Sequence, residues 1–172
     1  MPEWLVGLIS APPLAAALWI GLALLFGQAG GEAHERRTGR IALVACGASF
    51  AAALVLAVAR LAGSLPDRVV FGRWLTSGDY RVDLVFATDG LSLTLAVLAS
   101  LLCLFVARFA VNYMHREAGF HRLFMVLSLF AAAMALLVTS GNAVLTFVGW
   151  EVAGLCSYLL ISFFQDRPVA AS

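Results

Sequence analysis

The stretch Phe147–Phe164, FVGWEVAGLCSYLLISFF, decides the fold because its eighteen residues include a single charged side chain, Glu151. A helix of about 20 predominantly apolar residues is long enough to cross the hydrocarbon core of a bilayer. The stretch therefore predicts a membrane-spanning helix. It also raises the question of why a carboxylate lies inside such a helix.

The composition of the whole chain agrees with a membrane protein. Of the 172 residues, 62% are hydrophobic and 12% are charged, whereas about a quarter of the residues in a soluble domain are charged. The net charge of +1 provides no basic surface for a nucleic-acid partner. Cys46, Cys103 and Cys156 each lie in an apolar run without metal-ligand spacing, so we expect buried free thiols and no metal site.

Five segments are long and apolar enough to span a bilayer, which predicts an all-α integral membrane protein. They are approximately residues 4–27, 41–59, 91–111, 123–139 and 142–164. Pro12 and Pro13 predict a kink or a break in the first segment. Asp89 directly precedes the third segment, where it can cap the helix; an alternative role for Asp89 is a proton entry group.

The only long loop predicted between these spans, residues 60–88, contains a strand pattern. Apolar side chains alternate with Arg81 and Asp83 along residues 80–86, and a weaker strand covers residues 69–76. Ser77-Gly78-Asp79 is typical of a turn between two strands. We expect a small external β-hairpin here, with an irregular loop as the alternative. The chain then divides into residues 1–59 (two helices and a basic cytoplasmic loop), 60–88 (the external loop) and 89–172 (helices three to five).

Arginine positions predict the orientation, because cytoplasmic loops are enriched in Lys and Arg. All eleven residues of these two types are arginine. One side of the predicted membrane carries Arg36, Arg37, Arg40, Arg108, Arg116, Arg122 and Arg167, and the other carries Arg60, Arg68, Arg73 and Arg81. The excess places the N-terminus outside and residue 172 in the cytoplasm of a multi-pass protein of a cell inner membrane.

Glu151 lies near mid-membrane along its helix. It is about 14 Å from Asn142 and about 20 Å from Phe164 at 1.5 Å per residue. A charged group at that depth costs about 2.5–3.5 kcal/mol and almost always faces protein or water rather than lipid.

The small residues of the same helix indicate which way Glu151 points. Gly149, Ala153 and Ser157 form a stripe that favours close helix contact, and Glu151 lies roughly opposite them. We therefore expect this helix to be buried on both sides. Glu151 is then either a proton-carrying group or a structural partner in a buried ion pair or hydrogen bond.

Two histidines are the other candidates for metal binding. His115 and His121 lie six residues apart, which is the wrong spacing for a metal site on one helix. Because Arg116 and Arg122 directly follow them, we expect both histidines to lie in a solvated basic loop.

Three stretches together resemble a known family of membrane proteins. FVGWEVAGLCSYLLISFF (147–164) is similar to the region around the fifth transmembrane helix of the large antiporter-like subunit of respiratory complex I, chain L or chain 5. TDGLSLTLAVLASLLCLFV (88–106) and NYMHREAGFHRLFMVLSLFAAAMALLVTSGN (112–142) resemble its third helix and the loop with its fourth helix. The resemblance covers about residues 80–168, and its pattern Gly-Trp-Glu-x-x-Gly-x-x-Ser-Tyr-Leu-Leu-Ile is specific to the superfamily shared with Mrp-type antiporters.

The resemblance implies a proton-translocating membrane-arm subunit of a complex I-like NADH:quinone oxidoreductase, without a bound cofactor of its own. In the family, the glutamate on this helix joins a buried chain of charges with lysines on later helices, so Glu151 is carried over as the proton-translocating residue. Residues 89–172 would begin the antiporter-like core. The implied partners are the other membrane subunits, the lipid bilayer and protons.

The resemblance also implies a longer protein, because the family chain continues past the position of Ser172. We expect an N-terminal piece, whether truncated, split or incomplete in sequence. Other functions within the same superfamily are an Mrp-type cation/proton antiporter subunit and a membrane subunit for inorganic carbon uptake; a non-transporting structural fragment is a further alternative. No dinucleotide, quinone or iron–sulfur motif is present, so we expect no redox step in this chain itself.

Overall fold

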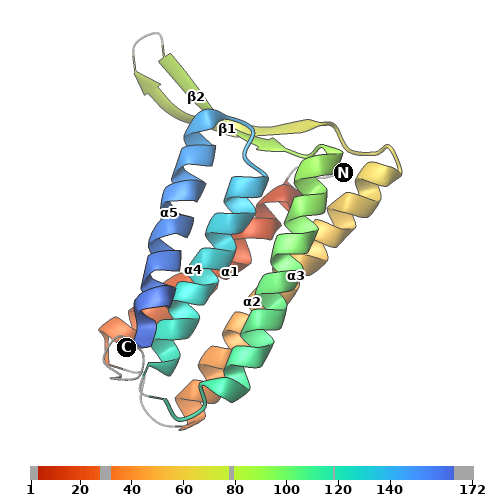
Figure 1. The fold of residues 1–172 in the computed structure, drawn as a ribbon. Helices are drawn as coiled ribbons and strands as arrows, with labels where there is room; N and C mark the ends of the chain where they lie inside the picture. Colours follow the sequence, from red (N-terminus) through yellow and green to blue (C-terminus); the bar gives the residue numbers. More distant parts are fainter. Residues whose placement is uncertain (1–3, 28–31, 78–79, 118, 165–172) are drawn as a thin grey trace.

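The computed structural model describes residues 4–27, 32–77, 80–117 and 119–164. In chain order these form α1 (Trp4–Leu25), α2 (Glu32–Leu61), β1 (Arg68–Ser77), β2 (Tyr80–Ala87), α3 (Gly90–Tyr113), α4 (Phe120–Val138), α5 (Ala143–Ile161) and a closing 3-10 turn (Ser162–Phe164). Five of the described helices are long and apolar enough to cross a membrane. Together with the two-stranded antiparallel sheet between α2 and α3, they confirm the predicted fold class (Figure 1).

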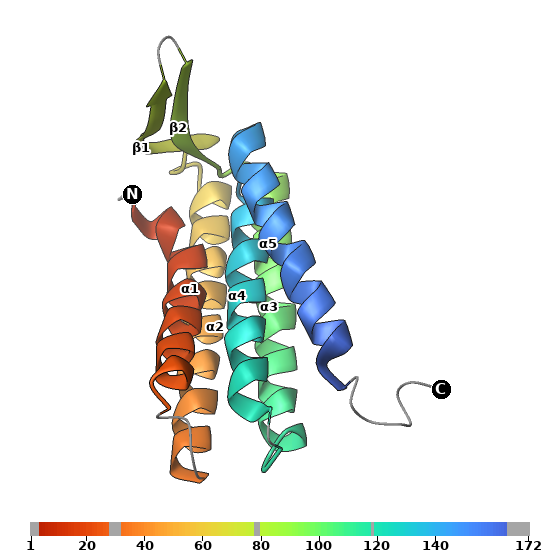
Figure 2. The same ribbon diagram turned by 90° about the vertical axis from the view of Figure 1, so that its left-hand side faces the viewer.

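Helix α4 lies at the centre of the bundle. It packs against α1, α2, α3 and α5, and half of the residues in its most apolar part are buried. Helix α5 packs mainly against α4. Only 22% of the residues in the most apolar part of α5 are buried. Figure 2 shows α5 at one side of the bundle, leaning away from the other helices toward its C-terminal end. Much of the surface of α5 is therefore uncovered in this chain.

Helix α1 continues through its two prolines, so the break suggested by the sequence does not occur. Pro13 has no backbone N–H, which leaves the carbonyl group of Ile9 without its usual donor in the helix. The hydroxyl group of Ser49 on α2 donates a hydrogen bond to this carbonyl oxygen at 2.5 Å, and all three residues are buried. Because a buried carbonyl group without a donor is costly in an apolar environment, this bond both satisfies α1 and fixes its crossing with α2.

Helix α2 begins nine residues before the apolar segment expected from the sequence. Arg36, Arg37 and Arg40 consequently lie on its first turns, and the prediction that they lie in a loop is wrong. Gly39 lies where these turns approach α3, because a Cβ atom at position 39 would lie 3.2 Å from Cγ2 of Val111. The absence of a side chain at that position lets the basic turns of α2 pack closely against α3.

The predicted β-hairpin is present and is attached to the turn between α4 and α5. Val69 pairs with Phe86 and Arg73 with Asp83, while the expected turn at Gly78 and Asp79 lies outside the described residues. Position 141 requires glycine because a Cβ atom there would lie 2.7 Å from the carbonyl oxygen of Val85. Three hydrogen bonds join β2 to this turn: Ala87 N–H to Thr139 O at 2.7 Å, Gly141 N–H to Val85 O at 2.8 Å, and Asn142 Nδ2 to Asp83 O at 2.7 Å.

Asp89 caps α3, as the sequence predicts. Its carboxylate accepts hydrogen bonds from the backbone N–H groups of Leu91 (2.9 Å) and Ser92 (3.0 Å) and from the hydroxyl group of Ser92 (3.0 Å). These bonds lower the pKa of Asp89 below its ordinary value because they stabilise the charged carboxylate, and the bond from the Ser92 N–H has the largest effect. The capping interaction therefore persists at neutral pH and weakens only when acid protonates Asp89.

Candidate functional site

The start of α5 is fixed by its N-cap residue, Asn142. The side-chain oxygen of Asn142 accepts a hydrogen bond from the Leu145 N–H at 2.9 Å, while its Nδ2 donates to the hairpin. Next to this cap, the hydroxyl groups of Ser140 and Thr146 lie 2.7 Å apart in a hydrogen bond. The first turn of α5 is therefore anchored to both α4 and β2, and this sets the orientation of every later residue on the helix.

One face of α5 packs closely against α4. Gly149 is buried where the two backbones meet, because a Cβ atom at this position would lie 2.9 Å from both the Cα atom and the backbone nitrogen of Leu137. Leu145, Ala153 and Cys156 are buried on the same face. The predicted stripe of small residues is thus correct for Gly149 and Ala153. It is wrong for its third member, because Cys156 is fully buried and Ser157 only partly so.

Glu151 lies on the opposite face of α5, as expected, and this face is exposed in the described structure. The aromatic neighbours of Glu151 are exposed as well: Phe147 by 64%, Trp150 by 68% and Tyr158 by 66%. Among the described residues, no side chain forms a hydrogen bond or an ion pair with the Glu151 carboxylate. The expectation that α5 is buried on both sides is therefore not met within this chain.

Exposed apolar side chains on α5 are compatible with contact to lipid, but Glu151 is not. The residue occupies the middle of a helix that is long and apolar enough to span a membrane. The glutamate side chain is too short to reach the headgroup region from that depth. A carboxylate in hydrocarbon carries a penalty of about 2.5–3.5 kcal/mol on insertion scales. This face of α5 therefore requires protein or water against it.

Of the two histidines near the α3–α4 connection, His115 lies in an exposed turn, as expected, and His121 does not. His121 is buried in α4, and its Nδ1 atom lies 2.9 Å from the hydroxyl oxygen of Thr38 on α2. His115 is partly exposed, and its Nδ1 atom lies 3.2 Å from a carboxylate oxygen of Glu35. The prediction of a solvated position is thus wrong for His121, because packing of α2 against α4 encloses it. Among the described residues, no group of three His, Cys, Asp or Glu side chains is placed to hold a metal ion.

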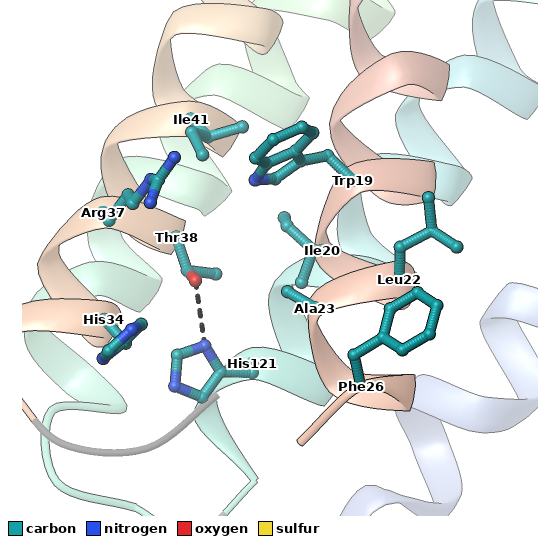
Figure 3. Close-up of a pocket in the computed structure, with 10 residues that line it drawn as sticks. All are labelled: Trp19, Ile20, Leu22, Ala23, Phe26, His34, Arg37, Thr38, Ile41 and His121. Carbon is teal, nitrogen blue, oxygen red and sulfur yellow. Dashed lines mark hydrogen bonds between the residues drawn. The ribbon is translucent and has the colours of Figure 1, made fainter. Parts of the chain in front are cut away.

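Beside His121 lies a cavity of about 220 Å³ that sequence analysis does not identify. Its lining side chains converge from α1, α2 and α4, and they include Trp19, Arg37 and Thr38 (Figure 3). The guanidinium carbon of Arg37 lies 5.6 Å from the centre of a Trp19 ring. No spacing in the sequence joins these residues, because their proximity depends on which helices are neighbours.

The chain is similar in sequence to known subunits of quinone oxidoreductases. Residues 74–124, from β1 to the start of α4, match the family model described as NADH-ubiquinone oxidoreductase (complex I), chain 5 N-terminus. The chain is 33% identical over 96% of its length to NAD(P)H-quinone oxidoreductase subunit 5 of the chloroplast of Nephroselmis olivacea, of which it covers 26%.

Two further relatives come from other lineages. The chain is 33% identical over 97% of its length to NAD(P)H-quinone oxidoreductase chain 5 of a Synechocystis species, of which it covers 24%. It is 36% identical over 61% of its length to NADH-ubiquinone oxidoreductase chain 5 of Candida albicans, of which it covers 19%. The chain thus spans about a quarter of the length of the curated relatives that it matches over most of its own length.

The fold and these relatives agree. The five spanning helices and the kinship to subunits of a membrane complex make this a multi-pass membrane protein. Because the similarity extends over nearly the whole chain and the matched family model describes the chain 5 N-terminus, the chain corresponds in sequence to the N-terminal part of the chain 5 subunits of complex I-type quinone oxidoreductases.

Proposed function

We propose that this chain contributes to a proton-translocating membrane-arm subunit of a complex I-like NADH:quinone oxidoreductase. The observation that carries the proposal is Glu151, an ionisable side chain at the middle of α5 on a face that the rest of this chain leaves uncovered. Intramembrane carboxylates of this kind commonly serve proton relays, where they alternate between the protonated and the charged form. The relatives bear the names of quinone oxidoreductase subunits, which favours this setting over the other superfamily functions.

In this mechanism the chain supplies one proton-carrying group and its rigid support. The contact of Gly149 with Leu137 holds the backbone of α5 against α4, and the Asn142 cap fixes the start of the helix. The Glu151 carboxylate therefore projects from a fixed position toward groups outside this chain. Electron transfer takes place elsewhere in the assembly, and movement of charge near Glu151 makes the carboxylate take up or release its proton.

Purification with native partners tests the proposal. A chain carrying an affinity tag and extracted in mild detergent should bring with it the membrane and quinone-reducing subunits of a complex I-like assembly, identified by mass spectrometry. Cation/proton antiporter subunits would instead support the Mrp-type function, and a zinc protein of the cytoplasm would support carbon uptake. Recovery of the chain without any membrane partner would contradict a role in a membrane arm.

We further propose that the β-hairpin lies outside a cell inner membrane, and that the basic first turns of α2 lie in the cytoplasm. The three native cysteines are buried, so the unmodified chain provides a low background for thiol labelling. Thr76→Cys on β1 and His34→Cys on α2 introduce exposed thiols at opposite ends of the bundle. In intact cells an impermeant maleimide should label the first variant and not the second. The reverse pattern would invert the orientation, and equal labelling would exclude the arrangement.

A further inference from the structure

A groove of about 590 Å³ lies between α1 and α2, away from the face that carries Glu151. Its walls are mostly small apolar side chains, which include Ala15, Ala16, Ala45 and Ala48. At one end the groove adjoins the cavity beside His121, because Trp19, Arg37 and Ile41 line both. The groove is apolar toward Ala48 and becomes polar at the end where Arg37 and Arg40 lie, which we call its mouth.

The mouth of this groove carries positive charge. Arg37 and Arg40 are exposed, lie three residues apart on α2 and both line the groove. Among the described residues that line either hollow, none is Asp or Glu. The nearby carboxylate of Glu35 is directed elsewhere, toward His115 at 3.2 Å and the backbone N–H of Arg116 at 3.3 Å. Two guanidinium groups without a described carboxylate partner therefore line the mouth, and that of Arg37 lies 5.6 Å from the centre of a Trp19 ring.

The length of the groove matches one leaflet of a bilayer. Arg37 and Ala48 are eleven residues apart, or about 16 Å along α2, which is about half of a 30 Å hydrocarbon core. Just beyond Ala48, the hydrogen bond from Ser49 to the Ile9 carbonyl group brings α1 and α2 together. A spanning helix of another subunit would need a contact surface that extends across both leaflets. One acyl chain extends across a single leaflet, which is the length of this groove.

We propose that this groove binds a membrane phospholipid with an anionic headgroup, its phosphate at Arg37 and Arg40 and one acyl chain along the alanine-lined walls. Basic hollows between membrane helices are suited to such headgroups, and an indole ring at the same level suits the membrane interface. The occupant is a lipid because the two arginines at the mouth complement a negative headgroup, and the apolar walls extend from there over the length of an acyl chain. This lipid site is distinct from Glu151 and does not depend on proton translocation.

Native mass spectrometry of the purified chain tests the headgroup preference. The protein in detergent is supplied with equal amounts of phosphatidylglycerol and phosphatidylcholine of the same chain length. We expect preferential retention of phosphatidylglycerol, because its headgroup has a net negative charge and that of phosphatidylcholine has none. This preference should fall roughly thirtyfold in Arg37→Gln/Arg40→Gln, because each arginine near an anionic headgroup contributes a factor of about five. Arg108→Gln is the matched control, since Arg108 is exposed on α3 and lines neither hollow. Equal retention of the two lipids, or an equal effect of Arg108→Gln, would overturn the site.

A second pair of variants tests the path of the acyl chain. Ala48→Leu fills the groove, whereas Ala51→Leu adds the same volume at an exposed position of α2 that does not line it. Only Ala48→Leu should reduce retention of both lipids at least tenfold. Excess glycerol 3-phosphate should not displace the lipid, and displacement would mean that the mouth recognises phosphate alone. A photoreactive side chain at position 48 should form adducts with lipid in native membranes; adducts with a polypeptide would show that another subunit occupies the groove and would contradict the proposal.

Discussion

Replacement of Gly149 by leucine is expected to detach α5 from α4. A Cβ atom at position 149 would lie 2.9 Å from the backbone of Leu137, and backbone cannot move aside as the end of a flexible side chain can. Inserted volume in a packed contact typically costs about 1–3 kcal/mol. We expect the upper end of this range or more for Gly149→Leu, measured as the free energy of unfolding of the purified chain in detergent micelles.

Gly154 offers a matched control on the same helix. It lies on the exposed face, and no atom lies within 4 Å of the position that its Cβ atom would take. Gly154→Leu should therefore leave the stability of the isolated chain unchanged within about 0.5 kcal/mol. If both variants destabilise the isolated chain equally, α5 does not pack through Gly149 as the structure shows.

Gly154→Leu is expected to be harmful only in a complete assembly. If other protein covers the face of α5 that carries Glu151, Gly154→Leu should reduce the yield of assembled complex although it leaves the isolated chain intact. Normal assembly of this variant would indicate that the face remains open to lipid or water. Since a carboxylate at this depth is incompatible with lipid, that outcome would indicate water rather than protein against Glu151.

Loss of the titratable group at Glu151 is expected to have the largest functional effect. Glu151→Gln keeps the size of the side chain and most of its hydrogen-bonding capacity but cannot carry a proton as a carboxylate does. Removal of a positioned proton-transfer group typically costs a factor of about 10²–10⁴, so we expect at least a hundredfold fall in the rate of proton translocation per assembled complex. Glu151→Asp keeps the chemistry with a shorter reach and should retain part of the rate.

A purely structural role for Glu151 predicts a different pattern. In that case the carboxylate would neutralise a buried cation of another helix, and Glu151→Gln would leave that cation unpaired at a cost of about 3–5 kcal/mol. Assembly would then fail together with activity. The yield of assembled complex, measured on native gels beside the translocation rate, separates the two roles.

Much of the fold follows from local pattern. Long apolar runs indicate the spanning helices, the alternation along residues 80–86 indicates β2, and a single carboxylate within an apolar run indicates Glu151. The depth and the direction of Glu151 follow from helical geometry alone, because one turn of helix fixes which residues share a face.

Features that depend on neighbouring helices could not be predicted in this way. Arg37 and His121 are polar residues near predicted loops, yet the packing of α1, α2 and α4 brings them to the edge of one cavity. The helical start of α2 was missed because hydropathy detects only the apolar part of a helix that extends into the polar interface. The sequence pattern also predicts that the Glu151 face needs cover, but it does not identify the chain that provides this cover.

Proton pumping by sealed vesicles that contain the complete assembly with Glu151→Gln is the most direct test of the role of Glu151. Electron transfer from NADH to quinone and proton uptake are recorded together, and both are divided by the amount of assembled complex. We expect normal assembly with proton uptake reduced at least a hundredfold, and partial uptake in Glu151→Asp. Unchanged uptake in Glu151→Gln, or a loss fully explained by lost assembly, would show that Glu151 does not carry the proton.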